Sequence, residues 1–311
     1  MIVSSEILIE IPEAGKHLTG DPLRGIVKFN LDQDAVYERV TLTLVEKTCT
    51  RNIYDRTNIA DYCTIPIKAG DLSQYQTRKV VKVKLINANT DEVVILRTGT
   101  HEHSFEMTIP ENTPPSVKIT EKGRTLAGIR YFLILKFKKL EMFSLSDYCI
   151  TKLTLYPRID SSSTEKPLIA SLEKTLTKLF STKKHDIQLK AELDKEYLIP
   201  GSERKIIFIV NNNSDLIFSV QSELICKTKT SLRFQKAIEK IEVLETVATP
   251  SIPDNSISNM FNMIPVAADL YTVRHSDVIT REYVVRVTMK LPTPHSNVFV
   301  EIPVFAGERV I

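Results

Sequence analysis

The chain has 311 residues, about twice the usual length of one domain, so two domains are the first expectation. Hydrophobic residues make up 42% and charged residues 25% of the sequence, which supplies two apolar cores and excludes a disordered or collagen-like chain. The 41 basic and 38 acidic residues leave a net charge of +3, which gives no reason to expect a nucleic acid as partner.

Alternating apolar and polar residues dominate the first half of the chain. In residues 5–11, Ile7, Ile9 and Ile11 fall on one face and polar residues on much of the other. Similar alternation marks residues 27–31, 40–44, 79–86, 105–109 and 129–140. A period of two predicts antiparallel strands with one buried and one wet face. Because no helical pattern separates these strands, the sequence predicts an all-β protein built from sandwiches.

The second half repeats this pattern in strands predicted at residues 185–193, 206–210, 218–226, 281–290 and 298–305. Each half begins with a glycine turn, at Gly20 and Gly201, and continues to a strand that ends in Lys-Thr. A repeat of this length is a whole domain, so two copies of one sandwich are predicted.

The predicted boundary follows residue 157. Residues 1–157 are expected to form the first sandwich, residues 158–185 a linker, and residues 186–311 the second sandwich. Residues 157–166 are polar and turn-forming, as linkers are. Four leucines then fall at helical spacing, at Leu168, Leu172, Leu176 and Leu179. They predict either a short amphipathic helix or an extended linker in a groove of the first domain.

No catalytic motif is found in the sequence. It lacks a nucleophile elbow, a glycine-rich phosphate loop, a zinc-protease helix and a calcium loop. His101 and His103 would share one face of a strand and so could approach one metal ion, but no third ligand is evident nearby. We therefore expect a structural histidine pair, no enzyme, no metal and no cofactor.

The four cysteines, Cys49, Cys63, Cys149 and Cys226, are scattered and form no CxxC pair. This spacing favours reduced thiols in a cytosolic protein over disulfides or a zinc site. The sequence has no run of about 18 apolar residues, and its N-terminus does not look like a signal peptide.

Basic side chains gather on two predicted strands. Lys82 and Lys84 fall on one side of their strand, and Lys136 and Lys138 on one side of theirs. One interpretation is a solvated sheet face. The other is a cradle for an acidic or phosphorylated peptide, in which several ammonium groups meet phosphate oxygens. A free sheet edge offers a second route, since an extended peptide can add to it as a strand.

Several runs of the sequence resemble one family in order along the chain. Residues 20–29 (GDPLRGIVKF) and 99–110 (GTHEHSFEMTIP) resemble a turn-strand pair and a later strand of arrestin N-terminal domains. Residues 193–201, 211–214 and 302–307 resemble the opening and the last strand of arrestin C-terminal domains. The resemblance implies two tandem antiparallel, immunoglobulin-like β-sandwiches of arrestin type.

The resemblance also suggests a branch of the family. Residues 82–96 are strand-like where receptor-desensitising arrestins carry a helix, which is similar to the arrestin-domain-containing proteins, or α-arrestins. Those proteins typically carry PPxY motifs that bind ubiquitin ligases, whereas this chain contains none, so a member without a PPxY tail is expected. By its position, Lys152 falls near the family's phosphate-sensing arginine.

The function implied by the resemblance is that of a non-enzymatic cytoplasmic adaptor, recruited to the plasma membrane or to endosomes. It would bind the tails of membrane receptors or transporters, with or without phosphate, and direct their endocytosis, sorting or ubiquitination, the last through a ubiquitin ligase. Lys82, Lys84, Lys136, Lys138 and Lys152 are the candidate binding residues. The alternative is a structural subunit of an endosomal sorting coat, like the arrestin-shaped subunit of retromer.

Overall fold

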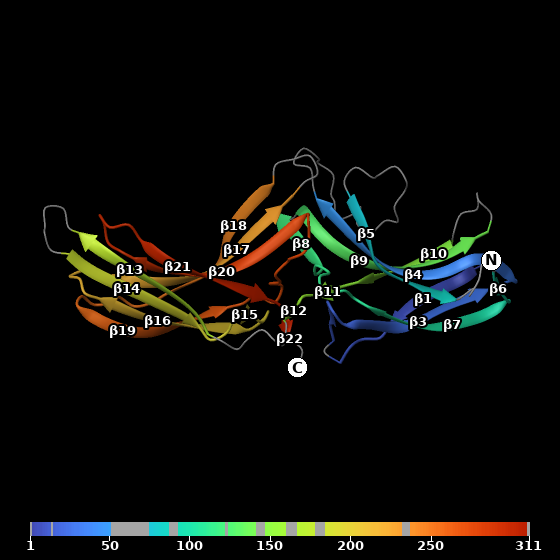
Figure 1. The fold of residues 1–311 in the computed structure, drawn as a ribbon, viewed down its shortest axis with the longest axis horizontal. Helices are drawn as coiled ribbons and strands as arrows, with labels where there is room; N and C mark the ends of the chain where they lie inside the picture. Colours follow the sequence, from blue (N-terminus) through green and yellow to red (C-terminus); the bar gives the residue numbers. More distant parts are fainter. Residues whose placement is uncertain are drawn as a thin grey trace. The chain divides into compact units, whose positions relative to one another are not determined.

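The fold was analysed in a computed structural model, which describes residues 2–13, 15–50, 75–86, 93–121, 124–140, 147–159, 167–177, 184–231 and 237–309. Every regular element in these ranges is a β-strand (Figure 1). The predicted all-β class is therefore confirmed. Among the described residues there is also no helix long and apolar enough to cross a membrane.

The chain divides into two compact units. The first holds the residues up to Pro157 together with Arg274–Ile279, and the second holds most of the remainder. The strands of the first unit are β1 (Ile2–Ile9), β2 (His17–Leu18), β3 (Pro22–Leu31), β4 (Ala35–Thr50), β5 (Tyr75–Ile86), β6 (Val94–Leu96), β7 (Gly99–Thr108), β8 (Val117–Glu121), β9 (Arg124–Lys139), β10 (Asp147–Leu153) and β11 (Leu155–Tyr156).

The first unit is built on two antiparallel sheets. One has the order β1-β3-β7, and the other has the order β10-β9-β4-β5, with β6 added to β4 and β8 added to β9. Alternation along β3 buries Val27, Phe29 and Leu31 while their neighbours face outwards. The ring of Phe29 meets that of Phe137 edge to face at 4.9 Å, so an aromatic contact joins the buried faces of the two sheets.

Gly25 allows the three-stranded sheet of the first unit to pack tightly. A Cβ atom at this position would overlap the carbonyl oxygen of Leu8 and would lie 2.8 Å from the ring of Phe105. Only a residue without a side chain fits between these two groups, because such contacts are shorter than van der Waals contact. The glycine of the predicted turn-strand motif therefore has a steric role.

The second unit repeats the plan of the first. Its strands are β12 (Arg158–Ile159), β13 (Leu168–Thr177), β14 (Lys184–Leu193), β15 (Tyr197–Leu198), β16 (Glu203–Asn212), β17 (Ser219–Thr230), β18 (Ile238–Ala248), β19 (Ser256–Pro265), β20 (Ile279–Lys290), β21 (Val298–Ala306) and β22 (Glu308–Arg309). Strands β12 and β22 pair with each other, and the others form one sheet in the order β13-β14-β16-β19 and another in the order β15-β21-β20-β17-β18. A core of buried aliphatic side chains from both sheets, with Phe208 and Tyr283, fills the space between them.

The two units share a detail at their first turns. Gly20 and Gly201 both adopt positive φ, at 89° and 79°, immediately before the central strands β3 and β16. The amide of Gly20 donates to the carbonyl of Ile109, and that of Gly201 donates to the carbonyl of Val266. Each acceptor directly follows the edge strand that pairs with that central strand, β7 or β19. The predicted internal repeat thus extends to its turns.

The structure corrects the predicted linker. Residues 168–177 form neither a helix nor an extended segment in a groove of the first domain, because they are strand β13 and pair along their whole length with β14. Leucines at positions 168, 172 and 176 are spaced by four, which is one helical face but also one strand face. The leucine pattern therefore could not distinguish a helix from a strand. The residues form a strand because they pair with the edge of β14. Residues 160–166 and Leu179 lie outside the described residues.

Candidate anion-binding face

The outer face of the sheet β10-β9-β4-β5 carries the candidate site. On its inner face, Leu42, Leu44, Leu133 and Leu135 are fully buried. The residues between them point the other way, so that Thr43 of β4 lies between Lys82 of β5 and Ile134 of β9. Burial of the inner side chains therefore fixes which residues reach the outer face.

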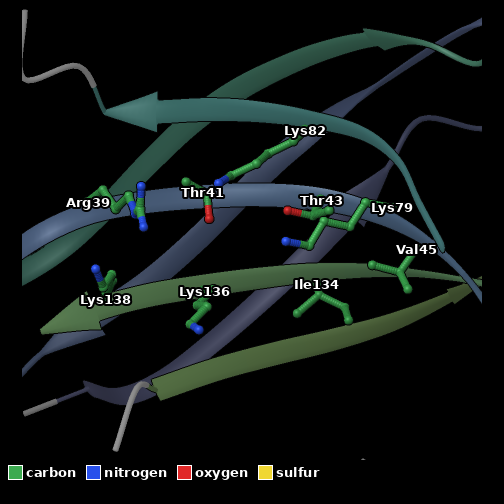
Figure 2. Close-up of a pocket in the computed structure, with 9 residues that line it drawn as sticks. All are labelled: Arg39, Thr41, Thr43, Val45, Lys79, Lys82, Ile134, Lys136 and Lys138. Carbon is green, nitrogen blue, oxygen red and sulfur yellow. The ribbon is translucent and has the colours of Figure 1, made fainter. Parts of the chain in front are cut away.

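A pocket of about 250 Å³ opens on this outer face (Figure 2). Five basic side chains line it, and we call them the cationic cluster: Arg39, Lys79, Lys82, Lys136 and Lys138. Thr41, Thr43, Val45 and Ile134 complete the lining. The two threonines are more than nine-tenths buried, so their hydroxyl groups, which can donate hydrogen bonds, lie below the level of the ammonium groups.

Only part of the cationic cluster is neutralised within the protein. Glu38 pairs with Lys138 and lies 3.7 Å from the guanidinium of Arg39. A hydrogen bond from Lys138 is the main cause that lowers the pKa of Glu38. Within the described ranges, Lys79, Lys82 and Lys136 have no ion pair at all.

The remaining charges repel one another. Burial and then the charges of Arg39, Lys79, Lys136 and Lys84 lower the pKa of Lys82. A polyanion placed in the pocket would relieve this repulsion and would find several ammonium groups for its oxygens. The arrangement can therefore bind an anion electrostatically.

The structure brings together three of the five predicted residues. Lys82, Lys136 and Lys138 line the pocket. Lys84 lies on the same face opposite Thr41, beyond the pocket lining, and Lys152 lies opposite Phe132 on the neighbouring strand β10. These two lysines extend the basic face on either side of the pocket.

Sequence reasoning missed Arg39 and Lys79. Lys79 and Lys82 are three residues apart, so simple alternation places them on opposite faces. The pairing of β5 with β4 shifts by one residue between Val45–Lys79 and Leu44–Val81, and this β-bulge turns both lysines to the same side. A similar shift lies between Tyr37 and Arg39 on β4. A bulge of this kind leaves no clear signal in a single sequence.

His101 and His103 form an aromatic stack. The ring of Phe29 lies parallel to both, with centroids 5.0 Å and 5.7 Å away, and the two imidazoles are 6.4 Å apart. The Nε2 atom of His101 lies 2.8 Å from the carbonyl oxygen of Arg97, whereas that of His103 is buried without a hydrogen-bond partner. Burial lowers the pKa of His103, and the charge of His101 adds to this.

The described residues contain no group of three His, Cys, Asp or Glu side chains that could hold a metal ion. The geometry of the histidine pair fits packing at the end of the core. Three of the four cysteines are described, and among the described residues Cys49, Cys149 and Cys226 take part in no disulfide bond. Cys63 lies outside the described residues.

Comparison with known proteins agrees with the fold. Residues 9–161 match the family described as arrestin (or S-antigen), N-terminal domain. Among curated relatives, the lateral-eye arrestin of Limulus polyphemus is 25% identical over 183 residues, which are 56% of this chain and 44% of the relative. Phosrestin-1 of Calliphora vicina is 25% identical over 194 residues, which are 58% of this chain and 46% of the relative.

The match covers the first unit from residue 9 onwards, and the cationic cluster lies within the matched range. The first unit is therefore an arrestin N-terminal domain. The aligned stretches span less than half the length of either relative.

Proposed function

We propose that the chain is a non-enzymatic adaptor that binds the cytoplasmic tails of membrane receptors or transporters and directs their endocytosis, sorting or ubiquitination. Members of the arrestin family are generally non-enzymatic adaptors, and membership suggests a receptor-binding role. The two units would act as the N-terminal and C-terminal sandwiches of an arrestin body. The protein would work in the cytoplasm and reach the plasma membrane or endosomes through its partners.

The observation that carries the proposal is the incompletely neutralised cationic cluster. An acidic or phosphorylated tail would place an anionic group in the pocket, where Lys79, Lys82 and Lys136 have no ion pair among the described residues. The buried hydroxyls of Thr41 and Thr43 would donate to its oxygens from below. Lys84 and Lys152 would contact acidic residues of the tail on either side of this anionic group.

The test compares a phosphorylated tail peptide with its unphosphorylated form. The double variant Lys82→Glu and Lys136→Glu should weaken binding of the phosphorylated peptide by about 10- to 100-fold, since a hydrogen bond to a charged group contributes roughly 1.5–3 kcal/mol. Binding of the unphosphorylated form should change much less. Calorimetric titration of both peptides measures the difference.

A control variant separates the site from overall charge. Lys118→Glu and Lys290→Glu make the same change in net charge away from the cationic cluster, and this variant should bind as the unchanged protein does. Equal losses of affinity for both peptides, or equal losses of affinity in both variants, would show that the cluster is only a solvated surface. Failure of the unchanged protein to bind any receptor or transporter tail would contradict the adaptor role. Stoichiometric co-purification with one obligate partner would favour the coat-subunit alternative instead.

A further inference from the structure

Strand β19 is an open edge in the second unit. In the part of the chain that the structure describes, it pairs with β16 and ends the sheet β13-β14-β16-β19. The strand is firmly held, because its inward-facing Asn262 donates hydrogen bonds to Ser222 Oγ at 2.9 Å and to the carbonyl of Val247 at 3.2 Å. A strand held in this way keeps its unpaired row of backbone groups in place for a second strand.

The sequence of β19 lacks the usual protection of an edge. Its ten residues, SISNMFNMIP, include no charged side chain, and the single proline stands at the end of the strand. Proteins normally guard exposed edges with charges, prolines or bulges against pairing with another chain. Each of the other described edge strands of five residues or more carries at least one charged residue: β1, β5, β7, β8, β10, β13 and β18.

Apolar side chains are exposed beside this edge. Ile257 is 74% exposed, Phe261 59% and Met263 39%, and all three lie on the outer face of β19. Ile209 of β16, opposite Asn259, continues the apolar surface inwards. We call these four residues the apolar patch. Exposed clusters of this kind mark surfaces at which proteins associate.

The sequence of β19 is complementary to itself. When two copies pair antiparallel about a two-fold axis at Asn259, Ile257 of each copy lies opposite Phe261 of the other, and the two Asn259 residues meet at the axis. The outer faces remain on the same side, because the pairing relates residues of equal parity. Because β19 has no charged side chain, this pairing brings no like charges together, and nothing in the strand repels a second copy of itself.

We propose that β19 is a self-association edge at which a second copy of this chain pairs antiparallel, so that two four-stranded sheets become one eight-stranded sheet. The pairing satisfies the open backbone groups of both edges and brings the two apolar patches together. This association is isologous and closes as a dimer. It is independent of the cationic cluster, which lies in the other unit.

The test measures the mass of the full chain by light scattering and by sedimentation over a range of concentrations. The mass should rise from 35.3 kDa towards twice that value as the concentration increases. The variant Asn259→Lys places two like charges opposite each other at the axis and should remain at 35.3 kDa where the unchanged protein is dimeric. The control Thr175→Lys adds the same charge to the exposed face of β13, the opposite edge strand of the same sheet, and should not affect the dimer.

A cross-link tests the register directly and does not depend on the stability of the lysine variant. Copies carrying Asn259→Cys should form a disulfide-linked dimer on mild oxidation, whereas copies carrying Thr175→Cys, on the far edge strand β13, should not. A dimer that persists in Asn259→Lys and is not cross-linked through position 259 would overturn the proposal by placing the interface elsewhere. A chain that stays monomeric at every concentration would also overturn it and would leave the edge to a partner of another kind.

Discussion

Each unit has a sheet with a buried apolar inner face, but the outer faces of the two sheets carry different kinds of side chain. In the sheet β10-β9-β4-β5, the inner residues are buried leucines, while the outer residues include the cationic cluster and its two buried threonines. In the sheet β13-β14-β16-β19, the inner residues are again mostly apolar, while the outer residues include the apolar patch. The comparison teaches that the period-two pattern and the buried half of each strand determine the fold. The other half is free to differ and holds the residues of both proposed binding surfaces.

The largest expected difference is in the free energy of unfolding, between variants at two neighbouring residues on opposite faces of β9. Leu135→Ala removes a fully buried side chain and should lower the free energy of unfolding by about 2–5 kcal/mol. Lys136→Ala, one residue further, should change it by less than about 0.5 kcal/mol. Denaturant unfolding of the two variants measures both values. A loss of similar size in the two would contradict the separation of roles between the faces.

A smaller effect should distinguish the two exteriors by their response to salt. Raising the ionic strength from about 0.1 M to about 1 M shortens the screening length from roughly 10 Å to 3 Å. Binding of a phosphorylated peptide to the cationic cluster should then weaken by about 10-fold or more, because it rests on several ion pairs at roughly 1 kcal/mol each. Self-association through β19 should hold, since no ion pair crosses it. Titrations at both ionic strengths would show the two responses, and parallel losses would contradict the contrast.

A third surface, on the sheet that contains β17, β20 and β21, carries charges that are paired with one another. Glu301 accepts hydrogen bonds from Lys227 at 2.9 Å and from Arg286 at 2.7 Å. Burial alone would raise the pKa of Glu301, but these two hydrogen bonds and the two positive charges outweigh it, so the pKa lies below its usual 4.5.

The pH dependence follows from the direction of that shift. The folded protein holds the proton of Glu301 less tightly than the unfolded chain does, so this carboxylate contributes stability above about pH 4.5 that is lost as the pH falls through its lower folded value. Glu301→Gln should remove that part of the acid sensitivity. Unfolding experiments between neutral pH and pH 3 compare the slopes, and an unchanged slope would contradict the ion-pair assignment.

The smallest effect concerns repulsion within the cationic cluster. Lys82→Gln removes one of several neighbouring positive charges and should raise the free energy of unfolding by a few tenths of a kcal/mol, as surface substitutions do. The same substitution at Lys229, which pairs with Glu239, should not raise it. Thermal unfolding at low ionic strength measures the two variants. A loss of stability for Lys82→Gln would contradict mutual repulsion in the cluster.

Much of the fold could be predicted from the sequence, because buried strand faces leave a period-two signal. That signal identified the all-β class, many of the long strands and the repeat that begins at Gly20 and Gly201, but it did not identify β18 or β19. It failed at β13, where leucines spaced by four satisfy a helix and a strand equally. Whether these residues form a helix or a strand depends on pairing with the edge of β14. The sequence of one strand does not reveal which strand it pairs with.

The candidate site was predicted in part, for a related reason. Lys82, Lys136 and Lys138 were found because alternation holds around them. Lys79 was missed because a β-bulge reverses the parity of β5 between it and Lys82. The apolar patch of β19 gave no signal either, since an exposed Phe261 and a buried one look alike in a sequence. Whether a strand lies at the edge of its sheet is known only when the sheet is assembled.

The crowding at Gly25 has a consequence for recognising remote relatives of this chain. Any sequence that keeps β1, β3 and β7 at this spacing must place a glycine at that position of β3, since even alanine would strike the carbonyl oxygen of Leu8. Where overall identity has decayed too far to align two chains, that single invariant can still anchor the alignment. A candidate relative with a larger residue there must hold its first strand further from the strand that corresponds to β3.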